Sequence, residues 1–555
     1  MQLTGAEIVV KCLLEQGVDS IFGYPGGAVL NIYDALYKYQ DKITHYLTSH
    51  EQGAAHAADG YARATGRVGV CLATSGPGAT NLVTGIATAY MDSVPMVAIT
   101  GNVPIALLGK DSFQEVDIVG ITMPITKHNY IVKDIKELAP TLRKAFYIAK
   151  EGRPGPVLVD IPKDITAQQG EYLFEAPREV MESTKDIDFN SIDKAIELLR
   201  SCKKPLIYTG GGVVRSGAIR ELMEFAEKLQ APVTSSMMGL GGFPATHKLF
   251  TGMVGMHGTK TSNNAATECD LLIAIGTRFS DRAISKAEGF APEAKILHID
   301  IDPAEVNKNI KTHYSLIGTI NNVLQLLNER LERQQRGAWI RQIEEWQQQY
   351  PLSYSKNCNS LKPQYVIEKI WELTEDKAVI TTEVGQNQIW TALFYKFTRP
   401  RSFLTSGGLG TMGFGLGASL GAQVALPKKR VINIAGDGCF HMNCNELATA
   451  VKYNIPVIVV VLNNQVLGMV RQWQSLFYGE RYSETTLDRK TDIVKLAEAF
   501  GATGFSLSKA EEVEVVLHKA LSTEGPVVIN CEIDRDEKVF PMVPPGAKIQ
   551  DVILE

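Results

Sequence analysis

The chain of 555 residues is predicted to fold as α/β, with three doubly wound parallel-sheet domains. Two observations lead to this prediction. Short runs of apolar, β-branched residues alternate with longer stretches of helical periodicity, which is the pattern of parallel strands joined by helices. This alternation occurs in three segments separated by polar stretches, and a chain of this length is too long for one hydrophobic core.

The first predicted domain spans residues 1–170. It opens with a helix, because Thr4 and Glu7 form a capping box before the amphipathic stretch that follows. Its predicted strands are RVGVCLAT (67–74), VPMVAITG (94–101) and GPVLVDIP (155–162). A polar stretch at 176–189 is predicted to link it to the next domain.

The central domain is predicted at 190–335 and the third domain at 365–540. The central strands are KPLIYTGGG (204–212), DLLIAIGTR (270–278) and KILHIDID (295–302). The third domain has AVITTEVG (378–385), RVINIAGDG (430–438), IPVIVVVLNN (455–464) and PVVINCEID (526–534). Residues 336–364 are predicted to be a linker with some helix, and residues 541–555 a C-terminal tail. The first and third domains could share one architecture.

Composition excludes several classes of protein. The net charge of −5 and the lack of a basic block argue against a nucleic-acid partner. No apolar run approaches the ~20 residues of a membrane helix. The eight cysteines form no CxxC pair, which is typical of reduced thiols in an intracellular protein. We therefore expect a cytoplasmic protein without a membrane partner.

Polar residues follow two consecutive predicted strands of the third domain. Asp437 ends one strand, in GDG, and Asn464 ends the next, in NN. The carboxyl ends of neighbouring parallel strands meet at one edge of a sheet, where ligands bind. Carboxylate and amide oxygens suit Mg²⁺, and the backbone carbonyl of Val466 could add a third ligand. The glycines would let a diphosphate approach the backbone.

A glutamate lies in the alanine-rich stretch SHEQGAAHAADG, residues 49–60. His50 and His56 would point about 120° apart on a helix, so they cannot hold one metal ion together. The pairing of GDG with the later NN resembles the thiamine diphosphate (ThDP) motif. That resemblance implies a carboxylate from another domain that hydrogen-bonds the aminopyrimidine ring of the cofactor, and Glu51 matches it.

The resemblance covers essentially the whole chain. FGYPGGAVLNIYDAL, GGLGTMGFGLGASLGAQVA, LGMVRQWQSLFY and VFPMVPPGA are similar to segments of the catalytic large subunits of acetohydroxyacid synthases. The resemblance implies decarboxylation of pyruvate on ThDP. The hydroxyethyl group is then ligated to a second pyruvate, giving 2-acetolactate, or to 2-oxobutyrate, giving 2-aceto-2-hydroxybutyrate. These reactions begin branched-chain amino-acid biosynthesis. The three domains would bind the pyrimidine, FAD and the diphosphate in chain order.

The residues implied around ThDP follow strand ends and glycine-rich turns. Besides Glu51 they are Thr74, Pro77, Asn81, Val384, Gly385, Gln386, Asn387, Gly410, Met412, Gly438, Cys439 and Gly468. Met412 matches the family residue that wedges between the two rings of the cofactor. The metal ligands remain Asp437, Asn464 and Val466.

FAD is the second implied organic cofactor, and it would have no net redox role because carboligation moves no electrons. The residues implied are Arg153, Gly210, Gly211, Gly212, Met256, His257, Gly276, Thr277, Arg278, Arg282, Asp300 and Ile301. Glycines after strands, followed by an acidic strand end, suit dinucleotides generally. Ser280, in RFSDR, departs from the RFDDR that the family commonly shows.

The resemblance also implies the groups around the substrates. Gly27, Gln114, Lys163 and Phe113 match residues near the reacting carbons. Arg282 would pair with the carboxylate of the second 2-oxo acid. Trp473, with Met469 nearby, would pack on the ethyl group of 2-oxobutyrate, a discrimination of one methylene that is worth only ~1–3 kcal/mol.

Partners and alternatives remain open at this point. Glu51 and Asp437 lie far apart in the sequence yet would flank one cofactor, and the family implies two subunits, hence a homodimer or homotetramer. A regulatory small subunit is a further family expectation. The alternatives are an FAD-independent catabolic acetolactate synthase, a pyruvate oxidase, and a non-catalytic homologue. Glyoxylate carboligase is disfavoured, because that family lacks the glutamate found here at position 51.

Overall fold

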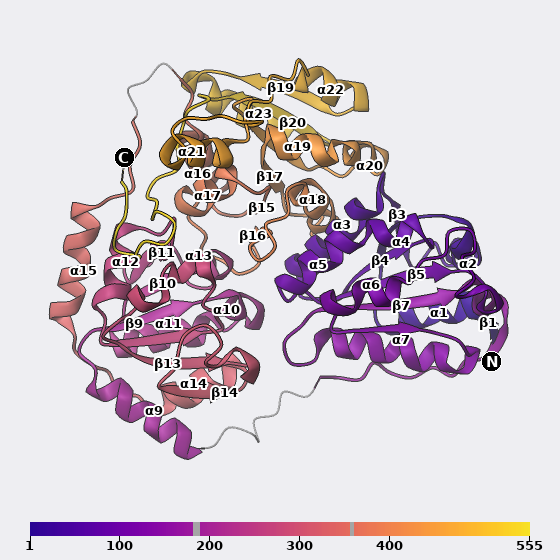
Figure 1. The fold of residues 1–555 in the computed structure, drawn as a ribbon, viewed down its shortest axis with the longest axis horizontal. Coiled ribbons are helices and arrows are strands. Elements are labelled where there is room, and N and C mark those ends of the chain that lie inside the picture. The colour runs from indigo at the N-terminus through magenta and orange to yellow at the C-terminus, as the bar shows by residue number, and fades with distance from the viewer. Residues whose placement is uncertain (181–188, 356–359, 555) are drawn as a thin grey trace.

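The computed structural model describes residues 1–180, 189–355 and 360–554. Parts of both predicted linkers, residues 181–188 and 356–359, lie outside these ranges. Three six-stranded parallel sheets run through the described residues, one in each predicted domain. They form three lobes, with the N-terminal lobe on the right of Figure 1, the central lobe at lower left and the C-terminal lobe at the top.

The N-terminal sheet contains every strand predicted for this part of the chain, with three further strands of four or five residues. In spatial order its strands are β3 (Thr44–Leu47), β2 (Ser20–Tyr24), β4 (Gly69–Ala73), β5 (Met96–Asn102), β7 (Pro156–Pro162) and β6 (His128–Ile131). Its helices are α1 (Gly5–Glu15), α2 (Leu30–Lys38), α3 (Glu51–Thr65), α4 (Pro77–Asn81), α5 (Val83–Met91), α6 (Ile118–Thr122), α7 (Ile135–Lys150) and α8 (Lys163–Ala167). The capping box of Thr4 and Glu7 is present at α1, as predicted. A separate antiparallel pair joins β1 (Gln2–Thr4) to β8 (Gln169–Glu171).

The central sheet is built in the same way. Its strands are β11 (Phe250–Met253), β10 (Val233–Ser235), β9 (Pro205–Thr209), β12 (Leu271–Ile275), β13 (Lys295–Asp300) and β14 (Tyr314–Ile317). Its helices are α9 (Phe189–Ser201), α10 (Gly211–Ser216), α11 (Ile219–Leu229), α12 (Lys260–Glu268), α13 (Asp281–Ile284), α14 (Ile320–Arg330) and α15 (Gly337–Gln349).

The C-terminal sheet holds the GDG and NN strand ends. Its strands are β16 (Phe403–Leu404), β15 (Val379–Thr382), β17 (Val431–Gly436), β18 (Ile458–Asn463), β20 (Val527–Glu532) and β19 (Thr503–Leu507). Its helices are α16 (Pro363–Thr374), α17 (Gln386–Phe394), α18 (Phe414–Ala425), α19 (Asp437–Asn443), α20 (Leu447–Lys452), α21 (Gly468–Phe477), α22 (Ile493–Phe500) and α23 (Val513–Ser522).

Each sheet is covered by helices on both faces, which makes all three domains doubly wound as predicted. In the N-terminal domain one core lies under α1, α2 and α7, and a second core lies under α3 and α5. The central and C-terminal sheets also have buried clusters on each face. Strands buried on both faces read as continuous apolar runs, which is why they were visible in the sequence.

The strand orders relate the outer domains to each other. Numbered along the chain within each sheet, the N-terminal and C-terminal sheets both have the order 2-1-3-4-6-5. They therefore share one architecture. The central sheet has the order 3-2-1-4-5-6, which is the arrangement of doubly wound dinucleotide-binding folds.

The two outer domains meet through helices α3 and α18, which lie side by side at the centre of Figure 1. Small residues allow this close approach. A Cβ atom at Gly60 would lie 2.0 Å from the carbonyl oxygen of Ala418, and one at Gly421 would lie 1.8 Å from that of Ala57. The helix that begins with Glu51 is thus fixed against the C-terminal domain of its own chain.

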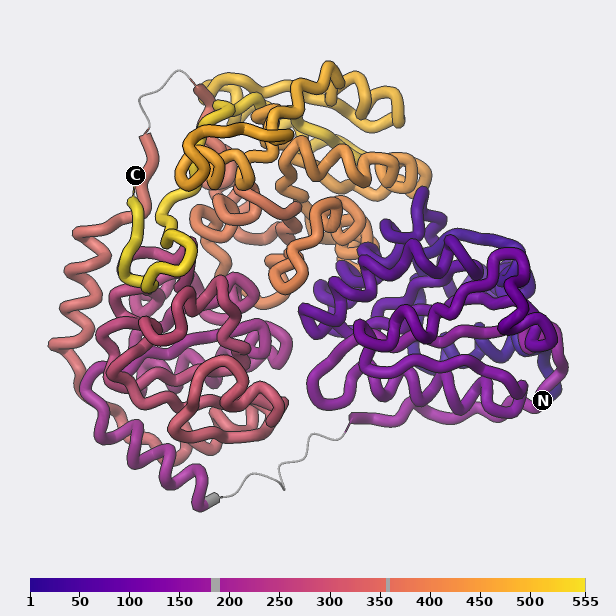
Figure 2. The backbone as a smooth tube through the Cα atoms, in the orientation of Figure 1, coloured from indigo at the N-terminus to yellow at the C-terminus, as the bar shows by residue number. Residues whose placement is uncertain are grey.

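The C-terminal tail returns to the central domain, as the yellow end of the tube shows in Figure 2. Ile549 is fully buried in a central-domain core together with Trp339 of α15. Residues 541–554 and the helix in the predicted linker therefore pack on this domain. In the described residues no helix combines the length and apolarity that crossing a bilayer requires.

Candidate active site

Asp437 and Asn464 lie at the same edge of the C-terminal sheet, as predicted. They directly follow β17 and β18, which pair in parallel with Gly436 opposite Leu462. Asp437 is 4% exposed and its Oδ1 has no hydrogen-bond partner. Burial raises the pKa of Asp437 to about 6. A buried carboxylate oxygen without a protein partner is a fitting ligand for a cation.

The turn after β15 lies beside this edge. Gly385 has φ 130° and is the N-cap of α17, a conformation that favours glycine. Gln386 Oε1 accepts a hydrogen bond from Asn464 Nδ2 at 3.4 Å. A Cβ at Gly468 would lie 2.0 Å from the same Gln386 oxygen. Several residues assigned to the diphosphate by resemblance are therefore neighbours.

Met412 reaches the same region from the loop before α18. Its Cε would lie 4.0 Å from a Cβ at Gly438. The loop is held by Glu383, which accepts from the backbone N–H of Gly413 at 2.8 Å and of Leu416 at 3.2 Å. Glu383 is fully buried, and burial raises its pKa to about 7. No sequence motif singled this carboxylate out.

A second group of predicted residues gathers in the N-terminal domain. Glu51 is the first residue of α3, and its Oε2 accepts from Asn81 Nδ2 at 3.0 Å. A Cβ at Gly78 would lie 3.2 Å from Glu51 Oε1 and 2.8 Å from Thr74. Pro77 begins α4 beside them. His50 caps α3 by accepting from the N–H of Gln52, which is a structural role.

Of the remaining N-terminal candidates, two are exposed and two are partly buried. Phe113 is 88% exposed, and Gly27 is exposed as well. Gln114 lies against the turn at Gly76, since a Cβ there would be 2.9 Å from the Gln114 Cα. Lys163, at the start of α8, is half-buried. Within one chain these residues do not line the main cavity.

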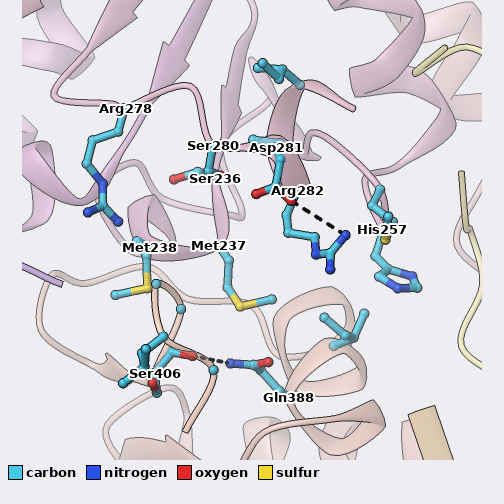
Figure 3. Close-up of a pocket in the computed structure, with 18 of the residues that line it drawn as sticks. Ser236, Met237, Met238, His257, Arg278, Ser280, Asp281, Arg282, Gln388 and Ser406 are labelled. Carbon is cyan, nitrogen blue, oxygen red and sulfur yellow. Dashed lines mark hydrogen bonds and ion pairs between the residues drawn. The ribbon is translucent and has the colours of Figure 1, made fainter. Parts of the chain in front are cut away.

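A cavity of about 1520 Å³ lies between the central and C-terminal domains. Figure 3 shows Arg278, Arg282 and His257 on the central side, facing the C-terminal side with Gln388 and Ser406. The predicted residues that line the cavity are Gly210, Gly211, Met256, His257, Gly276, Thr277, Arg278, Arg282, Val384, Gly385, Gly410, Met469 and Trp473. The volume exceeds that of an ordinary ligand pocket, about 300–1000 Å³, so there is room for more than one ligand.

Other predicted flavin residues do not line this cavity. Gly212 closes against Gly276, because its Cβ would lie 2.7 Å from the Gly276 Cα. Asp300 accepts from the N–H of Asp302, and Ile301 is 38% exposed. Arg153 donates to Ser93 Oγ at 2.8 Å and pairs with Asp302 at 3.3 Å.

Sequence reasoning did not single out a further set of cavity residues. They are Arg215, Ser236, Met237, Met238, Glu305, Lys308, Asn309, Gln388 and Ser406. Arg215 is notable because burial lowers the pKa of its guanidinium to about 10. Glu305 Oε2 is buried without a hydrogen-bond partner. Only the fold brings these residues to the cavity, although Ser236 and Ser406 follow strands β10 and β16 closely, which was a usable signal.

The comparisons with known proteins agree with this geometry. Family models match residues 3–121 (thiamine pyrophosphate enzyme, N-terminal TPP binding domain), 192–327 (central domain) and 383–531 (C-terminal TPP binding domain). These matches fall on the three sheets.

Three relatives match over nearly their whole length. An acetolactate synthase large subunit of Haemophilus influenzae is 45% identical, covering 100% of this chain and 98% of that protein. A probable acetolactate synthase large subunit of Methanocaldococcus jannaschii is 48% identical over 99% of this chain and 95% of the relative. The isozyme 2 large subunit of Escherichia coli is 46% identical over 99% of each. The chain therefore belongs to the thiamine pyrophosphate enzymes and, within them, to the acetolactate synthase large subunits.

Proposed function

We propose that this protein is an acetohydroxyacid synthase that joins two 2-oxo acids with loss of CO₂. Its substrates are pyruvate alone, or pyruvate with 2-oxobutyrate. The observation that carries the proposal is the buried, unpartnered Oδ1 of Asp437 beside Asn464, next to a cavity walled by Trp473. Full-length similarity to acetolactate synthase large subunits supports the same reaction.

Asp437 and Asn464 would hold Mg²⁺ together with the carbonyl of Val466. The described residues contain no cluster of three His, Cys, Asp or Glu side chains fit for a metal. That suits Mg²⁺, which is commonly held by one or two protein carboxylates with phosphate oxygens completing the shell. The turn at Gly385 and Gln386 would then receive the diphosphate at the N-terminus of α17.

When bound, ThDP supplies an electron sink that allows a 2-oxo acid to lose CO₂. Glu51 would hold a proton in a hydrogen bond to the ring nitrogen of the aminopyrimidine. Asn81, which donates to Glu51 at 3.0 Å, would orient that carboxylate. Met412 would support the bend between the cofactor rings.

The substrate side is assigned to residues from both halves of the site. Arg282, whose side chain is 66% exposed and 3.7 Å from Asp281, is free to turn toward a substrate carboxylate. Met469 and Trp473 would contact the ethyl group of 2-oxobutyrate. Gly27, Gln114, Lys163 and Phe113 would close the site from the N-terminal domain.

FAD would occupy the central part of the cavity. The 3-2-1-4-5-6 strand order and the glycines at the ends of β9 and β12 support a dinucleotide there. Ser280 lines the cavity and, as the N-cap residue of α13, makes no side-chain cap hydrogen bond. Its hydroxyl therefore remains available to a ligand in place of the family's aspartate.

A second copy of the chain would complete the site. Glu51, Thr74, Pro77 and Asn81 do not line the cavity that contains Trp473 in their own chain. Because α3 is locked against α18, the Glu51 group is expected to face the Asp437 edge of a partner. A homodimer is the smallest assembly that satisfies this, and a homotetramer would do so twice. A regulatory small subunit would bind outside the catalytic site.

An assay of the purified protein with pyruvate, 2-oxobutyrate, ThDP, Mg²⁺ and FAD tests this function. We expect both acetohydroxy acids and a yellow protein. A colourless protein that ignores 2-oxobutyrate would be a catabolic acetolactate synthase instead. Stoichiometric oxygen consumption with flavin reduction would indicate a pyruvate oxidase.

A further inference from the structure

Helix α21 carries a buried polar side chain, Gln472, on the face that packs into the protein. Gln472 is the only fully buried residue of this 10-residue helix, and it is 2% exposed. Met469 and Trp473 of the same helix line the cavity. Leaving a buried amide without partners costs about 1–3 kcal/mol, so the bonds of Gln472 contribute to how the helix docks.

Gln472 uses both ends of its carboxamide. Its Oε1 accepts from the backbone N–H of Val539 at 2.8 Å and from Gln386 Nε2 at 3.0 Å. Its Nε2 donates to the carbonyl of Val539 at 2.9 Å and to Met542 Sδ at 3.5 Å. An uncharged side chain with a donor and an acceptor side by side can pair with one residue's N–H and C=O in this way.

The first connection of Gln472 leads to the turn at Gly385 and Gln386, called the diphosphate turn below because it is proposed to receive the diphosphate. Gln386, which donates to Gln472, also donates to the carbonyl of Glu537 at 2.8 Å. On its other side it accepts from Asn464 Nδ2. One continuous set of side-chain hydrogen bonds therefore joins the edge proposed for Mg²⁺ to the helix that carries Trp473.

The second connection leads to the central domain. Beyond Val539, the carbonyl of Pro541 lies 3.0 Å from His257 Nδ1, and the N–H of Val543 donates to the carbonyl of Met256 at 2.7 Å. Burial lowers the pKa of His257 to about 4, so it is neutral near pH 7 and can donate from Nδ1. Residues 537–543 thus run from the diphosphate turn to the opposite wall of the cavity.

We propose that Gln472 is a positioning residue for the reaction. It holds the helix that bears Met469 and Trp473 in register with the Gln386 turn and with residues 537–543. Through these bonds it sets the affinity for ThDP and the choice between pyruvate and 2-oxobutyrate. The proposal rests on the proposed function, and it goes beyond that function because Gln472 itself lines no part of the cavity.

The test uses the full-length holoenzyme with two variants. Gln472→Met keeps the length of the side chain. Gln472→Glu keeps the acceptor that faces the Val539 N–H but replaces the donor with a second oxygen that faces the Val539 carbonyl. We expect the half-saturating ThDP concentration to rise about tenfold in Gln472→Met, which is the loss of ~1.4 kcal/mol. The product ratio in a pyruvate and 2-oxobutyrate mixture should shift about threefold or more toward acetolactate. Saturating ThDP should restore kcat to a greater extent than it restores the product ratio.

Gln423 provides a matched control. It is 1% exposed and makes the same kinds of bond, donating to Leu426 O at 3.1 Å and Lys429 O at 2.7 Å and accepting from Val431 N at 3.0 Å. It lies in α18 and lines no part of the cavity. Gln423→Met should lower the melting temperature and leave the ThDP half-saturation and the product ratio unchanged.

Three outcomes would overturn the proposal: unchanged cofactor affinity and product ratio in a folded Gln472→Met, the same changes in Gln423→Met, or additive effects of Gln386→Ala and Gln472→Glu on ThDP binding. Additivity would mean that the two side chains act independently. If Gln472→Met does not fold, the combination of Gln386→Ala with Gln472→Glu tests the proposal instead. If the wild type makes no acetohydroxy acid, the proposed function fails, yet calorimetry of ThDP with Mg²⁺ still tests Gln472.

Discussion

A carboxylate from another domain fills the space beside Gly53. A Cβ there would lie 2.2 Å from Glu446 Oε1. Glu446 is fully buried and accepts from the N–H of His50 at 3.0 Å and from Thr449 Oγ1 at 2.7 Å. Burial raises its pKa. The C-terminal domain is thus hydrogen-bonded to the first turn of α3, which fixes the position of Glu51.

Glu51→Gln is the sharpest test at this scale. The amide fits the same space and retains an oxygen for Asn81, so the fold should persist. It cannot share a proton with the aminopyrimidine, so turnover should fall by about 10²–10⁴. Acetolactate formation at saturating pyruvate and ThDP measures the loss, with thermal unfolding as the control for folding. Wild-type turnover in this variant would refute the proton role.

The buried carboxyl group of Asp160 makes the stability of the fold depend on pH. Burial raises its pKa to about 7, against the opposing hydrogen bonds from Asn102 and Thr100. The folded state therefore holds the proton more tightly than the unfolded state does. The contribution of Asp160 to stability is most favourable below the ordinary value of 3.8 and is lost as the pH rises to about 7.

Asp160→Asn removes the loss of stability that ionisation of Asp160 causes as the pH rises. Whatever the constant effect of the substitution, the melting temperature of the variant relative to wild type should rise between pH 5 and pH 8. The underlying change is ~1.4 kcal/mol per pH unit within the window where only the unfolded state is ionised. Scanning calorimetry at several pH values measures it. A difference independent of pH would show that Asp160 is not protonated in the folded protein.

At the scale of elements, helices α3 and α18 can cross closely because glycines at their contact points have no side chains. Gly421→Ala would press a methyl group against the backbone of Ala57, which cannot move aside as a side chain could. Overpacking of this kind costs about 1–3 kcal/mol or more. The melting temperature should fall clearly. Gly337→Ala in α15 is the control, because its Cβ meets only Arg341 Nη1 at 3.5 Å and should not destabilise.

Helix α21 carries the specificity prediction. Trp473→Leu removes aromatic surface from the cavity wall, and the preference for 2-oxobutyrate over pyruvate should fall by about ten- to a hundredfold at most. Product ratios from mixed substrates measure it. Trp346→Leu is the matched control, since Trp346 packs on Trp339 at 5.8 Å in α15 and lines no part of the cavity. An unchanged product ratio in Trp473→Leu would show that Trp473 does not select 2-oxobutyrate over pyruvate.

Sequence reasoning found the strands at the middle of each sheet. It missed the edge strands, and also β2 and β10, which lie next to an edge. The runs ending at Gly436 and Asn463 are buried on both faces and therefore apolar throughout, so they were evident. His128–Ile131 and Tyr314–Ile317 are short and half-exposed, and they carry no such signal. The strand ends located Asp437 and Asn464. Contacts between domains, such as Glu446 with His50, could not be inferred because they depend on how the sheets pack.

At the scale of the molecule, Asp92 joins the three domains. Its carboxylate accepts from the N–H of Gly408 at 2.8 Å and pairs with Arg63 at 2.9 Å, and its backbone carbonyl accepts from Arg215 of the central domain at 3.2 Å. Asp92 is 3% exposed, and breaking a buried network by removing one partner is strongly destabilising. This junction keeps the cavity walls at a fixed separation.

The proposed two-chain site predicts complementation between inactive variants. Glu51→Gln and Asp437→Ala should each abolish most activity in a homodimer. Mixed dimers would contain one site with both residues intact, so co-expression should restore about a quarter of wild-type turnover. Mass spectrometry of the mixed species provides the control. Failure to recover activity, with mixed dimers present, would mean that each site is built from a single chain.

The repeated strand order has a consequence for how such a protein is produced. Two related folding units, one carrying Glu51, the acid proposed for the ring, and the other Asp437, the acid proposed for the metal, are translated as a single polypeptide. Their stoichiometry is thus one to one from the moment of synthesis. A ribosome cannot make an excess of either half, and every chain that enters an assembly brings one of each component to pair with those of its neighbour.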